Sequence, residues 1–274
     1  MSMLSVNGPS ASASVRCYAR LALAGFHRAA AYWKASVAGL ISNTTFALIR
    51  AEILLVAVAP SGSIAGYDEG RIVAYAWVSQ GLYSVVLLWG DGELSKKVRT
   101  GDVAIDVSRP WNLQGALLAI DLGRAAFAVI TRLAPPIAIG ALFFSFRFPE
   151  RTAAWALFAV SAVLAVVISF TLRFILELTT FWLMDVKGVT QLYSVVAGTL
   201  SGLTIPLAFF PHWAQEILWL TPFPAVLQFP VDIFIERGEA GEILLQQAIW
   251  AAGLTLFAQF LYGRAQRKLV IQGG

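Results

Sequence analysis

The chain has 274 residues, of which 58% are hydrophobic and only 13% charged, with one cysteine, two histidines and a formal net charge of +4. Soluble domains carry about 25% charged residues, so this composition excludes an ordinary water-soluble fold and predicts an integral membrane protein. A single cysteine excludes an intrachain disulfide, and no Cys/His cluster with the spacing of a metal site occurs.

The first part of the chain, residues 1–36, is predicted to be a cytoplasmic tail followed by an interfacial helix. Basic residues interrupt the apolar ones throughout RCYARLALAGFHRAAAYWK, which excludes a signal peptide. Basic and apolar positions at helical spacing suit a helix that lies in the membrane interface, with Tyr32 and Trp33 at headgroup level. A simple juxtamembrane anchor is the alternative.

Residues 37–274 are predicted to form an all-α domain with six transmembrane helices. About 20 apolar residues cross a bilayer, and six runs approach that length: 37–59, 71–90, 123–145, 153–177, 189–210 and 243–263. With the N-terminus inside, the cytoplasmic segments hold thirteen Lys and Arg residues and the outer loops four. The positive-inside rule therefore places both termini in the cytoplasm.

The connection between the second and third runs, residues 91–110, is long enough to carry structure of its own. In ELSKKVRTGDV, the apolar residues Leu94, Val98 and Val103 fall near one face of a short amphipathic helix. A solvated linker is the alternative. No lysine follows a glycine anywhere in the chain, so it contains no Walker A motif, and no catalytic motif is found.

A proline-rich stretch, LTPFPAVLQFPVDIFIERG at residues 220–238, separates the fifth and sixth runs. Pro222, Pro224 and Pro230 remove backbone donors and block a continuous helix. The remaining residues are too apolar for a solvated loop. The stretch is therefore predicted to be a broken segment within the membrane, and an interfacial loop that lies flat is the alternative.

Several charges fall within the apolar runs, where they are candidates for function. Arg173 and Glu177 stand at i,i+4 and are predicted to neutralise each other. Arg132 precedes Pro135-Pro136 and is predicted to bond the carbonyls that the prolines release.

Glu52 is the charge without an obvious partner, because Arg50 at i,i−2 points to a different face. We expect Glu52 to contact a cationic substrate, with a role in helix packing as the alternative. Phe223 and Phe229 of the proline-rich stretch complete the predicted substrate pathway.

Four segments carry a resemblance to a known family: AYWKAS (31–36), ELSKKVRTGDVAIDVSRP (93–110), TPFPAVLQFPVDIFIERG (221–238) and RKLVIQGG (267–274). In these, the chain resembles the permeases of ABC type-2 exporters, closest to the six-span permeases of bacterial drug- or viologen-type exporters. The resemblance implies a permease in the bacterial inner membrane that has no catalytic site and exports an amphipathic or cationic small molecule.

The resemblance also implies the partners. A separate ABC ATPase dimer would bind ATP and magnesium, and a second permease chain, identical or homologous, would complete the pathway. Segment 91–110 would contact the ATPase, and segment 211–238 would re-enter the outer leaflet as a helical hairpin. The expected coupling residues are Glu93, Leu94, Lys96, Val98 and Arg99.

Two other function classes stay open at this point. An ion-gradient-driven secondary transporter would require a titratable acid near the midplane, and only Glu52 qualifies. A membrane assembly or structural protein would have no transport activity. No nucleic-acid partner is expected, because the membrane topology accounts for the basic residues.

Overall fold

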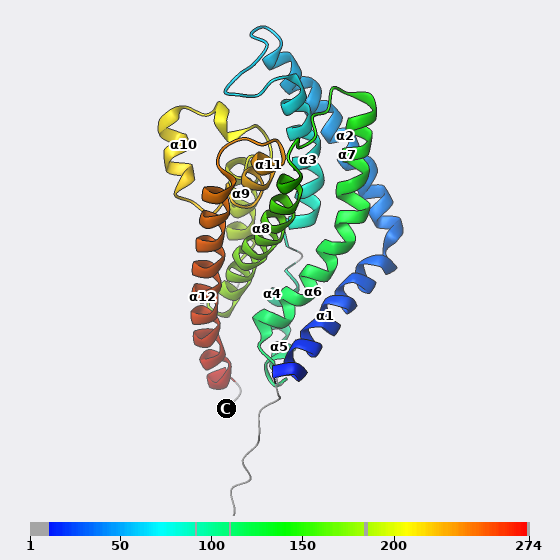
Figure 1. Ribbon diagram of the computed structural model, residues 1–274. Coiled ribbons are helices and arrows are strands. Elements are labelled where there is room, and N and C mark those ends of the chain that lie inside the picture. Colours follow the sequence, from blue (N-terminus) through cyan, green and yellow to red (C-terminus); the bar gives the residue numbers. More distant parts are fainter. Residues whose placement is uncertain (1–10, 91, 110, 184–185, 273–274) are drawn as a thin grey trace, which may run out of the picture.

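The computed structural model describes residues 11–90, 92–109, 111–183 and 186–272, and every regular element in this part of the chain is a helix (Figure 1). The first ten residues of the predicted tail and the last two of RKLVIQGG lie outside it. The helices, in chain order, are α1 (Ala11–Ala31), α2 (Trp33–Val58), α3 (Glu69–Val86), α4 (Glu93–Thr100), α5 (Val103–Val107), α6 (Leu113–Ala128), the π-helix η1 (Val129–Leu133), α7 (Ala134–Phe143), α8 (Thr152–Leu178), the 3₁₀ turn η2 (Thr179–Phe181), α9 (Lys187–Leu200), the 3₁₀ turn η3 (Leu207–Phe209), α10 (His212–Trp219), α11 (Gln228–Phe234) and α12 (Ala240–Gln272).

Four helical stretches are long and apolar enough to cross a membrane: Trp33–Val58, Leu113–Phe143, Thr152–Phe181 and Ala240–Lys268. They coincide with the first, third, fourth and sixth predicted runs, which confirms these four as candidate spans. The third is longer than predicted, because α6, η1 and α7 continue one another over 31 residues. At 1.5 Å per residue this stretch is about 46 Å long, more than a hydrocarbon core of about 30 Å requires.

The second predicted run forms α3, which lies in the centre of the bundle. Every side chain from Ile72 to Gly81 is buried, and α3 packs against α2, the η1–α7 stretch and α8. Its N-terminus is capped by Asp68, whose carboxylate accepts the backbone N–H of Arg71 at 2.8 Å. Because other helices surround α3, it can carry buried polar residues such as Ser79 and Gln80 that would be costly against lipid.

The fifth predicted run is not one continuous helix. Its helical part, α9, has 14 residues, about 21 Å, which is too short to cross the hydrocarbon core alone. The chain then turns at Gly202, where φ is +86° and a Cβ atom would lie 2.6 Å from Oε1 of Gln228 and 2.8 Å from the hydroxyl of Tyr75. Only glycine fits both the backbone angle and this close approach. Pro206 follows four residues later as the N-cap of the short 3₁₀ turn η3.

Segment 211–238 contains two short helices, α10 and α11, as predicted, whereas its re-entry into the membrane stays a prediction. Every residue from Pro224 to Ile235 is buried, and α11 packs against α8, α3 and α12. Pro230 occupies the first turn of α11, where a backbone N–H would have no partner within the helix, so the proline costs no helical hydrogen bond.

The N-terminal helix α1 packs along α6, and the two run side by side in Figure 1. Glycines allow the approach: a Cβ atom on Gly25 would lie 2.8 Å from the carbonyl carbon of Ile120, and one on Gly123 would lie 2.7 Å from that of Ala22. The helix predicted in this region is therefore present, and it is attached to the bundle. Its position in the membrane interface stays a prediction.

The prolines after η1 are accommodated by a π-turn. The backbone N–H of Ala134 bonds the carbonyl of Val129, five residues earlier, just before Pro135 and Pro136. The expectation for Arg132 was wrong: its guanidinium donates to the carbonyl of Ala35 in α2 at 3.4 Å. Arg132 thus joins α2 to the bent helix.

Both described ends of the chain lie at the same end of the bundle, together with α4 and α5, as the lower part of Figure 1 shows. We call this the termini end. The loop between α2 and α3, α10 and α11 lie toward the opposite end.

Candidate functional site

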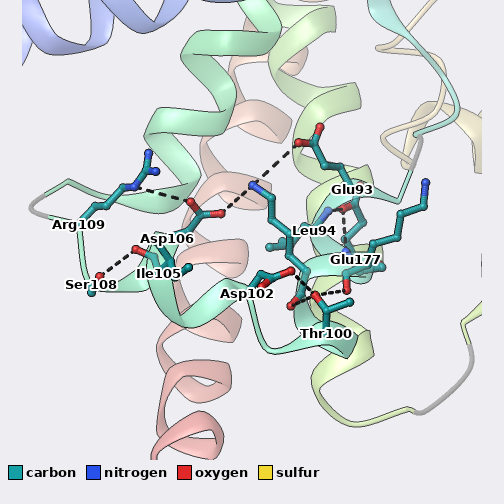
Figure 2. Close-up of polar contacts among 12 residues, drawn as sticks. Glu93, Leu94, Thr100, Asp102, Ile105, Asp106, Ser108, Arg109 and Glu177 are labelled. Atoms are coloured by element: carbon teal, nitrogen blue, oxygen red, sulfur yellow. Dashed lines mark hydrogen bonds and ion pairs between the residues drawn. The ribbon is translucent and has the colours of Figure 1, made fainter.

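The connection between α3 and α6 folds into two short helices at the termini end. The predicted amphipathic helix is confirmed over Glu93–Thr100 as α4. Gly101, with φ of +84°, caps its C-terminus, so Val103 does not belong to it. A second short helix, α5, follows directly. Figure 2 shows the two helices side by side with their polar contacts.

The apolar side of this helix pair packs against other helices of the same chain. Leu94 is 5% exposed and Val103 is fully buried, in a cluster that includes Phe174 and Leu178 of α8 and Tyr262 of α12. Val98 is half-buried against the same cluster. This packing argues against the expected contact of Leu94 and Val98 with the ATPase, because it leaves little of either side chain accessible.

The N-terminus of α4 is fixed to α8 by Glu177. Its Oε2 accepts the backbone N–H of Leu94 at 2.8 Å and that of Ser95 at 3.3 Å (Figure 2). The first turn of a helix has unpaired N–H groups and a partial positive charge, so a carboxylate stabilises it. The hydroxyl of Thr180 adds a bond to that of Ser95 at 2.9 Å. Three hydrogen bonds therefore attach the start of α4 to the end of α8.

Ion pairs connect α4 to its other neighbours. Glu93 pairs with Arg28 of α1 at 3.1 Å, and Lys97 pairs with Asp106 of α5 at 2.8 Å. Arg109 lies 3.8 Å from the same aspartate (Figure 2). Exposed pairs of this kind contribute about 0–1 kcal/mol each, so they orient α4 and α5 more than they stabilise them.

The sequence had predicted an ion pair between Arg173 and Glu177. In the structure Arg173 pairs with another residue. Its Nη2 lies 2.8 Å from Asp121 of α6, and both residues are less than 10% exposed. The other oxygen of Asp121 pairs with Arg124 at 2.6 Å, and Arg124 donates to the carbonyls of Ser84 and Val85 at the end of α3. This network connects α3, α6 and α8.

The sequence-based selection of charged residues missed Asp121, and also Arg124, which lies at the start of the third predicted run. The i,i+3 spacing of the two residues was a usable signal for an ion pair, but nothing in the sequence showed that Arg173 would share the carboxylate. The network is buried, so loss of one partner would leave a charge uncompensated.

The accessible surface of the α4–α5 pair lies at its tip. Arg99, Thr100, Asp102 and Ala104 are exposed there, and Ile105 is 61% exposed. Hydrogen bonds hold the tip in shape: Thr100 donates to Asp102 at 2.6 Å, and Ser108 donates to the carbonyl of Ile105 at 2.9 Å (Figure 2). Ile105 is the one large apolar side chain exposed within described residues 92–109, and the sequence analysis did not select it.

A second buried polar network lies near α11. Gln228 accepts hydrogen bonds from the hydroxyl of Tyr75 at 2.8 Å and the backbone N–H of Leu207 at 3.1 Å. Its amide nitrogen donates to Asp232 and to Tyr67. Gln228 thus joins the loop before α3, α3 itself, the turn after α9, and α11. The network gives the proline-rich segment a defined position inside the protein.

Three other charged side chains extend the contacts in this region. Arg50 of α2 donates to the carbonyls of Gly202 and Thr204, at 3.3 and 3.1 Å, and Arg237 lies 3.5 Å from Asp232. Glu236 accepts the backbone N–H of Glu150 at 3.0 Å and that of the next residue at 2.9 Å, and these bonds lower the pKa of Glu236.

The three residues of the predicted substrate pathway have different surroundings. Glu52 is exposed on α2 and forms no hydrogen bond or ion pair with another described residue. Phe229 is 2% exposed and packs against Trp219, with ring centroids 4.9 Å apart, while Phe223 is half-buried. Phe229 therefore belongs to the core of the chain.

The fold defines a multi-pass membrane protein in which a pair of short helices braces the transmembrane helices at one end. Within the described residues, no group of His, Cys, Asp and Glu is arranged to hold a metal ion. Residues 43–273 match the sequence model of the family described as ABC-2 family transporter protein. The chain therefore belongs to this family and is a membrane permease of an ABC transporter. Comparisons with curated proteins and with solved structures found no match.

Membership of this family implies that the chain acts with an ABC ATPase in the membrane. A permease of this kind is a transport subunit, usually without catalytic activity.

Proposed function

We propose that the chain is the permease subunit of an ATP-driven exporter in a bacterial inner membrane, with both termini in the cytoplasm. A separate ATPase dimer binds ATP and magnesium, and a second permease chain, identical or homologous, completes the pathway. The substrate is an amphipathic or cationic small molecule. The six-span arrangement, with α3 and the α9 segment as the second and fifth crossings and 211–238 re-entering the outer leaflet, belongs to the same proposal.

The observation that carries this proposal is the attachment of the α4–α5 pair to the long helices of the bundle. A permease that binds no nucleotide must receive force through a protein surface. The pair has an exposed tip, and its base is joined to α8 through Glu177 and to α1 through Glu93. Displacement of the tip by an ATPase would therefore act on α8 and α1 together.

The inward packing of Leu94 changes which residues should contact the ATPase. Buried apolar anchors dominate most protein interfaces, and charged residues at the rim contribute less. Ile105 is the apolar side chain available at the tip, and we assign it the role of anchor. Arg99 and Lys96 are exposed and are rim residues, whereas Leu94, Val98 and Glu93 hold the pair to the permease.

Substitutions at two positions distinguish a residue that contacts the ATPase from a residue that stabilises the permease. Ile105→Asp should weaken the association of purified permease and ATPase at least about 30-fold, the loss expected for an interface hot spot, and leave the thermal stability of the permease unchanged. Leu94→Asp should instead lower that stability, since it places a charge in a buried cluster. Association and coupled ATP hydrolysis of Ile105→Asp that equal those of Ile105→Leu would refute the assignment.

The exposure of Glu52 supports the proposal of a second permease chain. Charged residues within a membrane span face the interior of a bundle or a water-filled cavity, yet Glu52 faces away from the helices of its own chain. A second permease copy that forms a pathway along this face of α2 would resolve the conflict. Glu52→Gln should then weaken substrate-stimulated hydrolysis in the assembled complex and leave basal hydrolysis intact, while Glu239→Gln, in an exposed loop, serves as the matched control. An unchanged dose response for Glu52→Gln would remove this residue from the pathway.

A further inference from the structure

A cavity of about 400 Å³ lies at the termini end, between α4, the last turns of α8 and the start of α9. Its walls include Trp89, Lys96, Arg99, Arg173 and Tyr193. We call it the α4 cavity. None of the predicted pathway residues lines it.

Three polar atoms on residues that line the α4 cavity have no hydrogen-bond partner among the described residues. They are Nε1 of Trp89, Nε of Arg173 and the hydroxyl of Tyr193, and they come from three separate elements. Buried polar atoms without partners are rare and costly in folded proteins. Each of the three can donate a hydrogen bond, so an acceptor in the cavity would satisfy them.

The charge of the cavity is positive. Lys96 and Arg99 line it, are exposed, and form no ion pair with a described residue. Glu177 is the one acid among the described lining residues. Its carboxylate accepts two backbone N–H groups of α4, and the two cations Lys96 and Arg99 outnumber it.

The cavity lies near the end of a helical stretch that is long and apolar enough to cross a membrane, Thr152–Phe181. Arg173 stands five residues before the end of α8, about 8 Å along the helix axis. Tryptophan is enriched at membrane interfaces, and Trp89 lies in the wall of the same cavity. Basic pockets between transmembrane helices at such a position bind the phosphate of lipid headgroups.

We propose that the α4 cavity binds a phosphate-bearing anion, supplied either by an anionic phospholipid of the adjacent leaflet or by a soluble phosphomonoester. Lys96 and Arg99 would attract the phosphate at the mouth, and Arg173 and Tyr193 would donate hydrogen bonds to its oxygens. The occupied cavity would join α4, α8 and α9. This goes beyond the proposed transport function and does not depend on the partner ATPase.

The test measures equilibrium binding to the purified full-length chain in a neutral detergent. Three probes are compared: the anionic lipid phosphatidylglycerol, the zwitterionic lipid phosphatidylcholine, and soluble glycerol 3-phosphate. We expect phosphatidylglycerol or glycerol 3-phosphate to bind in a saturable manner and phosphatidylcholine to bind at least tenfold more weakly. Tight binding of phosphatidylglycerol alone identifies the lipid as the source, and equal binding of glycerol 3-phosphate identifies a soluble anion.

Two variants locate the binding in this cavity. Lys96→Ala/Arg99→Ala and Tyr193→Phe should each weaken binding about tenfold, the loss expected for contacts with a charged group. As a control, Arg264→Ala/Arg267→Ala removes two positive charges at the same end of the molecule and should leave binding unchanged. Tyr193→Phe should also keep or raise the melting temperature of the chain without probe, because it removes an unpaired buried hydroxyl.

The proposal is overturned if neither anion binds, or if both cavity variants bind like the control. It is also overturned if Tyr193→Phe stabilises the chain while binding stays at the wild-type level, since the hydroxyl would then be an unpaired group without a ligand.

Discussion

Replacement of Gly123 by alanine should force α1 away from α6. The added Cβ would lie 2.7 Å from the carbonyl carbon of Ala22 and 2.8 Å from the backbone nitrogen of Phe26. The carbonyl oxygen of Ala22 would lie nearer still. Carbon atoms pack best at about 3.5–4.0 Å, so the helices must separate by about 1–2 Å. Both contacts involve backbone atoms, which cannot rotate aside as a flexible side chain would.

The magnitude follows from two opposing terms. Alanine is favoured over glycine within a helix by about 0.5–1 kcal/mol. Overpacking costs about 1–3 kcal/mol, and we expect the upper part of this range because the obstacle is backbone. The net loss is then about 1–2 kcal/mol, which corresponds to a fall of about 2–8 °C in melting temperature for a chain of this size.

Thermal unfolding of the purified chain in a mild detergent measures the effect. Gly253→Ala is the matched control, because it adds the same methyl group to α12, where no atom lies within 4 Å, and it should keep or raise the melting temperature. Gly25→Ala meets the same helix pair from the other side, so the double variant should lose less than the sum of the single losses. A Gly123→Ala chain that is as stable as Gly253→Ala would refute the close packing of α1 on α6.

Three further predictions concern the buried networks and the topology. Asp121→Ala or Arg173→Met alone should lower the free energy of unfolding by about 3–5 kcal/mol, because each leaves a buried charge without its partner. The double variant should recover part of this loss. Strictly additive decreases in melting temperature would show that the two residues do not interact. Gln228→Leu should lower the free energy of unfolding by about 1–3 kcal/mol, since it leaves the buried backbone N–H of Leu207 without its acceptor, while the hydroxyls of Tyr75 and Tyr67 keep Gly202 and Asp232 as partners. Wild-type stability in the same assay would contradict the network. In a chain with its native cysteine replaced, Ser63→Cys should react with an impermeant thiol reagent from outside intact cells and Ser108→Cys only after lysis; labelling of position 108 from outside would reverse the orientation.

Arg173 and Glu177 show why spacing along one helix does not always give the ion-pair partner. Arg173 and Glu177 stand one helical turn apart, and this separation predicts a pair. In the structure, Asp121 of α6 approaches Arg173, and the N-terminus of α4 approaches Glu177. Both partners come from distant parts of the chain, so only the packing of α6 and α4 on α8 selects them. The same holds for Leu94: its place on the apolar face of α4 was readable, but the sequence did not say that α8 covers that face.

Composition and hydropathy by themselves determined the class of protein, four of its membrane-length helices and the short helix α4, because these features depend on local sequence and on the energetic cost of placing polar groups in lipid. The tertiary structure decided the rest. The fifth run breaks at Gly202 because Gln228 and Tyr75 occupy the space beside it, and α11 is buried because a polar network receives its Gln228 and Asp232. These outcomes depend on contacts between residues far apart in the chain, which no local pattern encodes.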